Sequence, residues 1–416
     1  MALVRPFRGL RPVPELAAEV AAPPYDVIES DEARELVKGH PHSFLHISKA
    51  EVDLDPSIDV HDPAVYEKAR KNLEAFIRGG ILIQDAAPCF YLYRLRMGEH
   101  EQTGLYACVS VEEYQKGTIK KHENTRIDKE IDRARHIDNL NAHTGPIFLM
   151  VRRSEEIQRL YLRAMEKQPA CRFVHEYGVE HTMWVIDDNA AIRALQDGFA
   201  AAGCLYIADG HHRAAAASRI GQERREKNPG HTGNEEYNFF PAVIFPDSEM
   251  QILNYNRAVR DLNGQSEGEF LKRLEAGFEV APSPGGKAFQ PEKRGRYGML
   301  LAGRWHVFTA RPGIRHPDDP IASLDVSILQ DSLLSPILGI RDPRTDKRIQ
   351  FVGGIRGLEE LERLVNGKGF AVAFSLYATG IDQLMKVADA GRVMPPKSTW
   401  FEPKLRSGLA THLLDG

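Results

Sequence analysis

Five consecutive residues, Asp209 to Arg213, hold the densest set of chemically useful side chains in the sequence. They read Asp-Gly-His-His-Arg and stand between the apolar run LYIA and the helix-forming run RAAAASRIGQE, so the sequence predicts a buried strand followed by a helix. The first N–H groups of a helix lack partners within the helix, and the helix dipole adds partial positive charge. Gly210 lets the main chain approach a phosphate closely, and Arg213 can donate two hydrogen bonds to it. The turn is therefore a predicted phosphate-binding site.

A plainer interpretation makes Asp209 a helix cap and leaves the two histidines on the surface of the first turn. We favour phosphate binding, because all five residues follow a buried strand. A metal site made by His211 and His212 alone is disfavoured, since adjacent histidines leave a helix in different directions and no third ligand stands four residues further on.

The second polar segment runs from Gly117 to Pro146 and reads GTIKKHENTRIDKEIDRARHIDNLNAHTGP. Its seven consecutive polar residues, 120–126, follow a predicted hairpin and precede a helix of mixed charge. Such a run is most often a solvated face. Here it combines a His-Glu pair with Lys and Arg and ends in the polar loop NAHTGP, so a solvated face and a functional segment remain equally open. If it is functional, we expect it to face the Asp209 turn across one cleft.

A third segment lies at Met394 to Leu409 and reads MPPKSTWFEPKLRSGL. Its prolines exclude regular structure and present Lys397, Ser398 and Thr399 together, with two aromatic residues as anchors. A C-terminal arm packed on the body of the protein is the plainer interpretation, and it is compatible with a function. The loops AAPPYDVI (21–28) and FVGGIRG (351–357) are weaker signals.

The elements that must position these residues follow an α/β or α+β pattern with mixed sheets, because apolar runs of strand length alternate with longer helical patterns. Residues 88–97 and 102–111 predict a hairpin, and residues 63–82 predict a helix that ends at a Gly-Gly pair. Residues 281–296 are rich in Pro, Gly and charge and predict a loop or a boundary.

The 416 residues suffice for two or three units with proper cores. We expect a core over residues 1–260, a second α/β domain over 261–393 and a C-terminal arm over 394–416 that packs back on the body.

The composition and charge of the chain limit the cellular compartments and the binding partners that we expect. The four cysteines stand singly, without the spacing of a zinc site, which indicates buried thiols in a reducing compartment. The N-terminus carries Arg and Pro where a signal peptide needs an apolar core, and no run reaches about 18 apolar residues. With a net charge of −4 there is no basic footprint for nucleic acid. We expect a cytoplasmic protein with a small-molecule substrate and no nucleic-acid or membrane partner, and homo-oligomerisation stays open.

The common nucleotide and hydrolase motifs G-x-x-x-x-G-K-[ST], G-x-G-x-x-G after a first strand, G-x-S-x-G and H-E-x-x-H do not occur. A different likeness is present. The segments APPYDVI, NLEAFIRGGIL, IKKHENTRIDKEIDR, YIADGHHRAAAA, FVGG and MPPKSTWFEPKLRSGL together resemble the bacterial family catalogued as domain of unknown function 1015. This resemblance covers nearly the whole chain.

The turn at 209–213 also resembles the phosphate-binding turn of the ParB/sulfiredoxin superfamily, whose members bind ATP, ADP or CTP at a strand–helix junction. It is similar to the turn of the free-serine kinases in that superfamily. The resemblance implies a ParB/sulfiredoxin-like nucleotide-binding core over residues 1–260. Sulfiredoxin has a cysteine in the turn where this chain has His211, and ParB clamps DNA through a helix-turn-helix and a basic surface that we do not find here. Neither of those two activities is expected.

Taken together, the resemblance and the phosphate-site argument predict a kinase that uses ATP or ADP with Mg²⁺ and phosphorylates a free hydroxy amino acid such as serine. In this hypothesis Glu123 is the general base, Asp209 holds the metal ion, and His212 takes part in catalysis. The predicted phosphate-binding residues are Gly210, His211, His212 and Arg213. The predicted substrate-binding residues are Lys121, His122, Arg126, Lys397, Ser398 and Thr399.

Two alternatives of a different class stay open. A non-catalytic nucleotide-binding regulator would use the same turn, but Glu123 would then be dispensable. An interaction protein whose polar loops are only solvated would need the three polar segments to lie apart in the fold.

Overall fold

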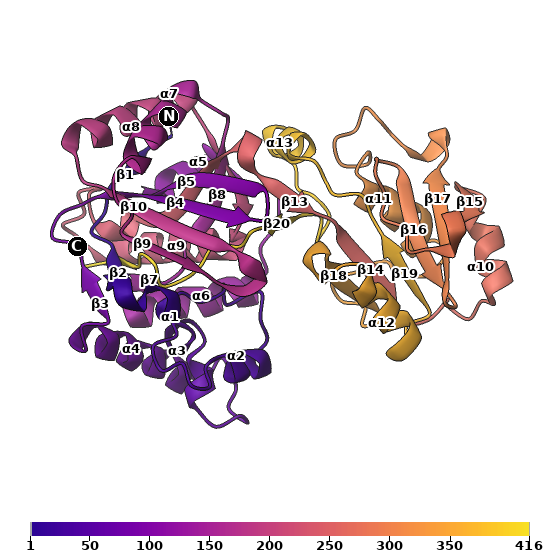
Figure 1. Ribbon diagram of the computed structural model, residues 1–416, viewed down its shortest axis with the longest axis horizontal. Coiled ribbons are helices and arrows are strands. Elements are labelled where there is room, and N and C mark those ends of the chain that lie inside the picture. Colours follow the sequence, from indigo (N-terminus) through magenta and orange to yellow (C-terminus); the bar gives the residue numbers. More distant parts are fainter. Residues whose placement is uncertain (1, 416) are drawn as a thin grey trace. The chain divides into compact units, whose positions relative to one another are not determined.

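The computed structural model describes residues 2–415, and it divides the chain into two compact units, residues 2–250 with 403–415 and residues 251–402 (Figure 1). The sequence-based boundaries were 260 and 393. Strand β14 (Tyr255–Val259) instead pairs within the second unit, and so does β20 (Trp400–Glu402). The loop at 281–296 also lies inside the second unit, so it is not a boundary between the two units.

The first unit contains most of the strands of the chain. They are β1 (Val4–Arg5), β2 (Leu10–Pro12), β3 (Leu82–Gln84), β4 (Phe90–Met97), β5 (His100–Ser110), β6 (Ile119–Lys120), β7 (Ala142–His143), β8 (Ile147–Val151), β9 (Cys171–Val174), β10 (Glu180–Ile186), β11 (Leu205–Asp209), β12 (Phe239–Pro246) and β21 (His412–Leu413). Its helices are α1 (Ala17–Val20), α2 (Ser30–Leu36), α3 (Leu45–Ser48), α4 (Pro63–Arg78), α5 (Val111–Lys116), α6 (Ile127–Leu140), α7 (Glu155–Met165), α8 (Asn189–Ala202) and α9 (His211–Lys227).

A mixed sheet in the order β6-β11-β8-β12-β5-β4-β10-β9 forms the centre of the first unit, and β1 also pairs with β5. β11 runs parallel to β6 and antiparallel to β8, whereas β12 runs parallel to β8. In Figure 1, α7 and α8 lie above this sheet and α1 to α4 lie below it. Phe199 of α8 and Ala214 of α9 are fully buried in the core that the sheet shares with its helices. The mixed α/β fold class is therefore confirmed.

Two local predictions hold in detail. β4 and β5 form the predicted antiparallel hairpin, with Met97 opposite His100 at its turn. α4 ends at Arg78, directly before the Gly-Gly pair. Local sequence patterns determine both elements. The hairpin follows from two strand-like runs joined by a polar turn, and α4 follows from apolar residues that recur about every 3.6 positions.

Helix α9 carries the turn of interest and buries an alanine face. Ala214, Ala216 and Ala217 are each at most 1 % exposed. Small side chains let a helix pack close to its neighbours. The helix continues through Gly221, where an added Cβ would lie 2.7 Å from the main-chain oxygen of Tyr237.

We expect Gly221→Ala to destabilise the protein, although alanine is the better helix former by about 1 kcal/mol. The new methyl group meets a main-chain oxygen that cannot rotate away, and such overpacking costs about 1–3 kcal/mol. Urea unfolding measures the change. The matched control is Gly268→Ala in α10, where an added Cβ meets nothing within 4 Å and alanine should stabilise the helix. A gain in stability for Gly221→Ala equal to that of the control would contradict the packing argument.

The second unit is a smaller α/β body. Its strands are β13 (Gln251–Leu253), β14, β15 (Phe278–Pro282), β16 (Arg296–Leu301), β17 (Arg304–Ala310), β18 (Ile349–Gly353), β19 (Val372–Ser375) and β20. Its helices are α10 (Glu267–Leu274), α11 (Asp325–Leu329), α12 (Glu359–Gly367) and α13 (Ile381–Asp389). Six of the strands form an antiparallel sheet in the order β15-β17-β16-β19-β14-β18.

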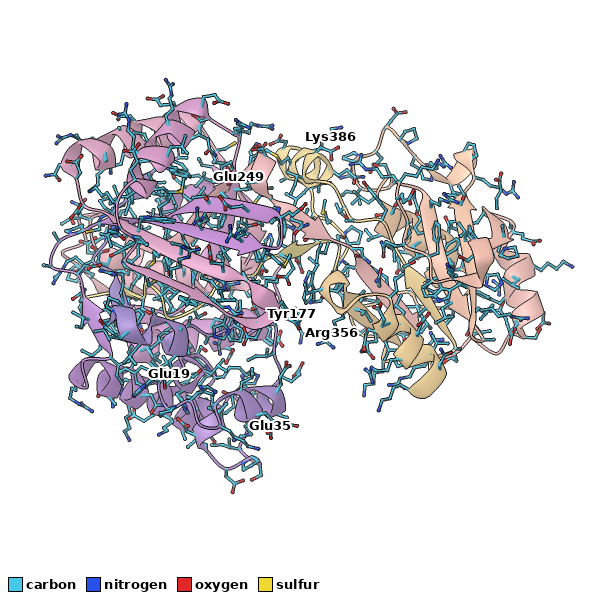
Figure 2. The ribbon with its side chains drawn as sticks, in the orientation of Figure 1. Glu19, Glu35, Tyr177, Glu249, Arg356 and Lys386 are labelled. Carbon is cyan, nitrogen blue, oxygen red and sulfur yellow. The ribbon has the colours of Figure 1, made fainter. Side chains whose placement is uncertain are left out.

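The chain leaves the first unit after Met250, and the preceding residue, Glu249, is labelled in Figure 2. The carboxylate of Glu249 accepts hydrogen bonds from the main-chain N–H of Thr103 (2.8 Å) and from the side-chain amide of Gln158 (2.9 Å). Residues 403–415 then return to the first unit. Ala22 and Ser407 exchange two main-chain hydrogen bonds there, and β21 pairs with β7. The first unit is thus closed by the C-terminal segment of the chain.

Among residues 2–415, no helix has both the length and the apolar character that crossing a membrane requires.

Candidate functional site

The predicted strand–turn–helix is present. β11 ends at Asp209, Gly210 stands at the N-cap with a φ of 93°, and α9 begins at His211 without a side-chain cap. An L-residue rarely adopts such a φ, which favours glycine. A Cβ at this position would also lie 3.0 Å from the guanidinium carbon of Arg213. Gly210 is therefore required by the backbone and by the packing of Arg213.

The segment that follows β6 lies against this turn, because β6 and β11 are adjacent parallel strands whose carboxyl ends meet at one edge of the sheet. The main-chain N–H of Arg126 donates to Nε2 of His212 at 3.1 Å. The N–H of His122 makes a long hydrogen bond to Nε2 of His211 at 3.5 Å. The structure thus brings together the two segments that the sequence predicts to face each other.

A His-Glu-His cluster lies at the centre of this contact. The potential ligand atoms of His122, Glu123 and His211 are all within 4.8 Å of one another, and the two imidazole rings are perpendicular with centroids 4.5 Å apart. His122 is 1 % exposed, and neither of its ring nitrogens has a hydrogen-bond partner among the described residues. Burial lowers the pKa of His122 to about 4. Burial and the neighbouring His122 ring hold the pKa of His211 well below its usual value.

This cluster changes the interpretation of the metal site. The histidines are neutral near neutral pH, so each ring keeps one nitrogen lone pair, and a metal ion on Nε2 of His211 would replace the long hydrogen bond from the N–H of His122. Two imidazoles with one carboxylate suit zinc and similar transition metals, whereas Mg²⁺ prefers oxygen ligands. The two further ligands that His211 lacks in its own helix, His122 and Glu123, come from the segment after β6. Sequence reasoning missed this set, because no local spacing links residues 122–123 to residue 211.

Asp209, the residue predicted to hold Mg²⁺, is engaged by cations of the protein. Its carboxylate lies 3.0 Å from Nζ of Lys404 and 3.8 Å from the guanidinium of Arg213. Although burial raises it, the pKa of Asp209 is held far below its usual range by these two cations. The geometry therefore favours the His-Glu-His cluster over Asp209 as a place for a metal ion. Lys404 lies within the third polar segment, but the sequence did not single it out.

Arg213 lies directly behind the turn. Its guanidinium donates to the carbonyl of Pro146 and stands 3.7 Å from the carboxylate of Asp26. The side chain is only 11 % exposed, and its Nε atom has no partner among the described residues. The role of Arg213 on a nucleotide phosphate stays a prediction, because its guanidinium is largely occupied by protein groups.

Two of the predicted substrate-binding residues, Lys121 and Arg126, lie in the segment after β6. The ammonium of Lys121 lies 5.8 Å from the ring centroid of Tyr114, and the exposed guanidinium of Arg126 pairs with Asp128 at 2.7 Å. These two side chains therefore have partners outside the cluster, whereas the main chain of Arg126 contacts the turn.

Lys397, Ser398 and Thr399 belong to the second unit. The hydroxyl of Ser398 is buried and donates to the carbonyl of Pro395 at 2.6 Å. The guanidinium of Arg257 donates to the carbonyl of Lys397 at 2.8 Å. These contacts hold the segment in place within its own unit, and its role in substrate binding stays a prediction.

Residues 4–327 match the family described as "Protein of unknown function (DUF1015)". The chain belongs to the DUF1015 family. No curated protein matches the sequence. The family resemblance inferred from the motifs is thus confirmed over most of the chain.

Three solved structures are similar to this DUF1015 chain. A conserved hypothetical protein from Pyrococcus furiosus is 14 % identical over 74 % of this chain and 96 % of its own, with a TM-score of 0.37. A free serine kinase in complex with AMP is 15 % identical over 71 % of this chain and 86 % of its own, with a TM-score of 0.37. SbnI with a C-terminal truncation, from Staphylococcus aureus, is 10 % identical over 74 % of this chain and 84 % of its own, with a TM-score of 0.37.

Proposed function

We propose that this DUF1015 protein is a nucleotide-dependent phosphotransferase, with ATP or ADP as donor and the hydroxyl of a small amino acid such as serine as acceptor. One observation carries the proposal. The Glu123 carboxylate lies beside the N-terminus of α9, in a contact closed by the Arg126 to His212 hydrogen bond. A proton acceptor and an anion-favouring helix end thus share one site.

The helix end supplies the phosphate-binding part. α9 has 17 residues and no side-chain cap, so its first N–H groups and its dipole favour an anion over the Gly210 turn. Lys404 adds a positive charge beside Asp209, which keeps that carboxylate from repelling phosphate oxygens. Gly210, His211 and His212 are the residues we assign to phosphate binding, with Arg213 supporting the turn from behind.

In the transfer step, the hydroxyl oxygen of the acceptor forms a bond to the terminal phosphorus of the nucleotide. The bond from that phosphorus to the leaving phosphate oxygen breaks, and the hydroxyl proton passes to the Glu123 carboxylate. A divalent ion, when bound, neutralises charge on the transferred phosphoryl group. His122 and His211 hold the Glu123 region in place from one side, and the His212 ring holds Arg126 from the other.

The proposal is tested by incubating the full chain with ATP or ADP and a panel of hydroxy amino acids, with and without Mg²⁺ or Zn²⁺, and following phosphorus NMR. A new phosphate monoester signal that depends on the acceptor is the expected result. Saturable nucleotide binding without any phosphoryl transfer would overturn the proposal of a kinase and would indicate the non-catalytic nucleotide-binding regulator instead.

A further inference from the structure

A small cavity of about 30 Å³ lies in the first unit, next to Arg213. Segments from across the first unit meet around it, including the loop at 21–28, α3, α6, the NAHTGP loop before β8, α9, β12 and the C-terminal segment after residue 403. Its polar lining consists chiefly of Tyr25, Ser48, Arg133, His143, Arg213 and Ser407. The sequence singled out most of these segments, and the proposed phosphoryl transfer uses only Arg213.

Three of the lining side chains carry a buried polar atom without a hydrogen-bond partner among the described residues. These atoms are Oγ of Ser48, Nε2 of His143 and Nε of Arg213. Ser48 is 6 % exposed and His143 is 5 % exposed, so bulk water does not satisfy them. An unsatisfied buried polar group costs about 1–3 kcal/mol. Three such atoms around one cavity indicate that a ligand with matching polar groups belongs there.

The direction of the hydrogen bond at His143 follows from its neighbours. Nε2 of His412 lies 2.8 Å from the Glu236 carboxylate, and Nδ1 of His412 lies 3.2 Å from Nδ1 of His143. The pKa of Glu236 is lowered by His412 against the effect of burial, so Glu236 accepts the proton of Nε2. Burial lowers the pKa of His412, so the ring is neutral and its Nδ1 is an acceptor.

His143 must then donate from Nδ1 to His412. Burial also lowers the pKa of His143, so this ring is neutral too, and its unpartnered Nε2 is a hydrogen-bond acceptor in a residue that lines the cavity. Nε–H of Arg213 and the hydroxyl of Ser48 are the unpartnered donors among the residues that line the same cavity. A ligand that satisfies these groups therefore accepts hydrogen bonds from Ser48 and Arg213 and donates one to His143.

Two guanidinium groups line the cavity on the side where the ligand accepts hydrogen bonds. Arg133 lies with its guanidinium carbon 4.0 Å from the ring centroid of Tyr25, and it lines the cavity together with Arg213. Arg133 is near the carboxylate of Asp132, and Arg213 is near the carboxylates of Asp26 and Asp209. The two guanidinium groups are thus held in place before a ligand arrives, and Nε–H of Arg213 is left over as a donor.

We propose that this cavity binds the carboxylate end of a small hydroxy acid or amino acid, with Ser48 and Arg213 donating to the oxyanion and His143 accepting from the neighbouring hydroxyl or ammonium group. The inference rests on the proposed function, because it names the class of the phosphoryl acceptor. A cavity of this size holds about two water molecules, which is room for a carboxylate and not for a nucleotide.

Calorimetric titration of the nucleotide-free full chain tests the proposal with four probes: L-serine, L-alanine, acetate and inorganic phosphate. We expect saturable binding of L-serine and L-alanine, with acetate weaker because it lacks a group to donate to His143. Ser48→Ala should weaken L-serine binding by about tenfold, the loss of one hydrogen bond to a charged group. The control, Ser57→Ala, removes an exposed hydroxyl that contacts only its neighbour Asp55 and should change nothing.

A second variant, His143→Phe, keeps an aromatic ring but removes the acceptor. It should weaken L-serine binding and leave acetate binding nearly unchanged. Phosphate binding tighter than L-serine, and equally sensitive to Ser48→Ala, would overturn the assignment to an acid in favour of a phosphate group. No saturable binding of any probe, or L-serine binding unaffected by Ser48→Ala, would mean that the cavity holds water only. L-serine binding without phosphoryl transfer would refute the proposed function and support the cavity.

Discussion

Glu123→Gln is expected to lower the rate of phosphoryl transfer by about 10²- to 10⁴-fold and to leave nucleotide binding intact. Glutamine keeps the size of the side chain but cannot take the hydroxyl proton of the acceptor, which is a poor nucleophile near neutral pH. Glu123 lies in the His-Glu-His cluster beside the N-terminus of α9, whereas the nearby carboxylate of Asp209 is paired with Lys404. Turnover and nucleotide affinity, measured separately for the variant, show whether the loss is confined to the chemical step.

The matched control is Glu112→Gln. Glu112 is exposed on α5 and pairs with Lys116 one helical turn away, so the substitution removes a surface charge and should leave turnover unchanged. Wild-type turnover for Glu123→Gln would end the assignment of Glu123 as the base, even if the protein proved to be a kinase. Loss of nucleotide binding together with turnover would instead point to damage at the turn.

Arg213→Ala is expected to destabilise the first unit by about 3–5 kcal/mol, the usual result of leaving buried charges without their partner. The substitution leaves the carboxylate of Asp26 without this guanidinium and the carboxylate of Asp209 with Lys404 alone. It also removes the donor to the carbonyl of Pro146. A role of Arg213 in phosphate binding alone, as the sequence predicts, would leave this variant folded with a loss of nucleotide affinity. The burial of Arg213 changes that expectation to a loss of stability.

Urea unfolding checks this prediction, with Arg219→Ala on the same helix as control. Arg219 pairs with Glu130, but its side chain is 39 % exposed, so its removal should cost no more than about 1 kcal/mol. Equal effects of the two substitutions would show that the ion pairs of Arg213 contribute little. Arg213→Lys should fall between them, because it keeps the charge but not the planar fork of donors.

The sequence by itself determined the local elements. The run 205–227 reads as strand, turn and helix because apolar residues, a glycine and strong helix formers follow one another in the order that each element requires. The hairpin of β4 and β5 and the end of α4 follow from patterns of the same kind, in which each residue is compared with neighbours a few positions away. Gly210 is part of this local information, since a positive φ at a helix start favours glycine whatever lies around it.

Only the tertiary structure decided which distant side chains meet at the turn. His122 and Glu123 reach His211 because β6, a strand of two residues, pairs in parallel with β11, and so short a strand leaves almost no pattern in the sequence. Lys404 reaches Asp209, and His412 reaches His143, because the chain returns to the first unit after residue 402. The boundaries of the units followed the pairing of β13 with β20 rather than the loop rich in Pro and Gly. Such contacts depend on the burial and hydrogen bonding of segments far apart in the chain. The spacing of residues within one segment therefore does not predict them.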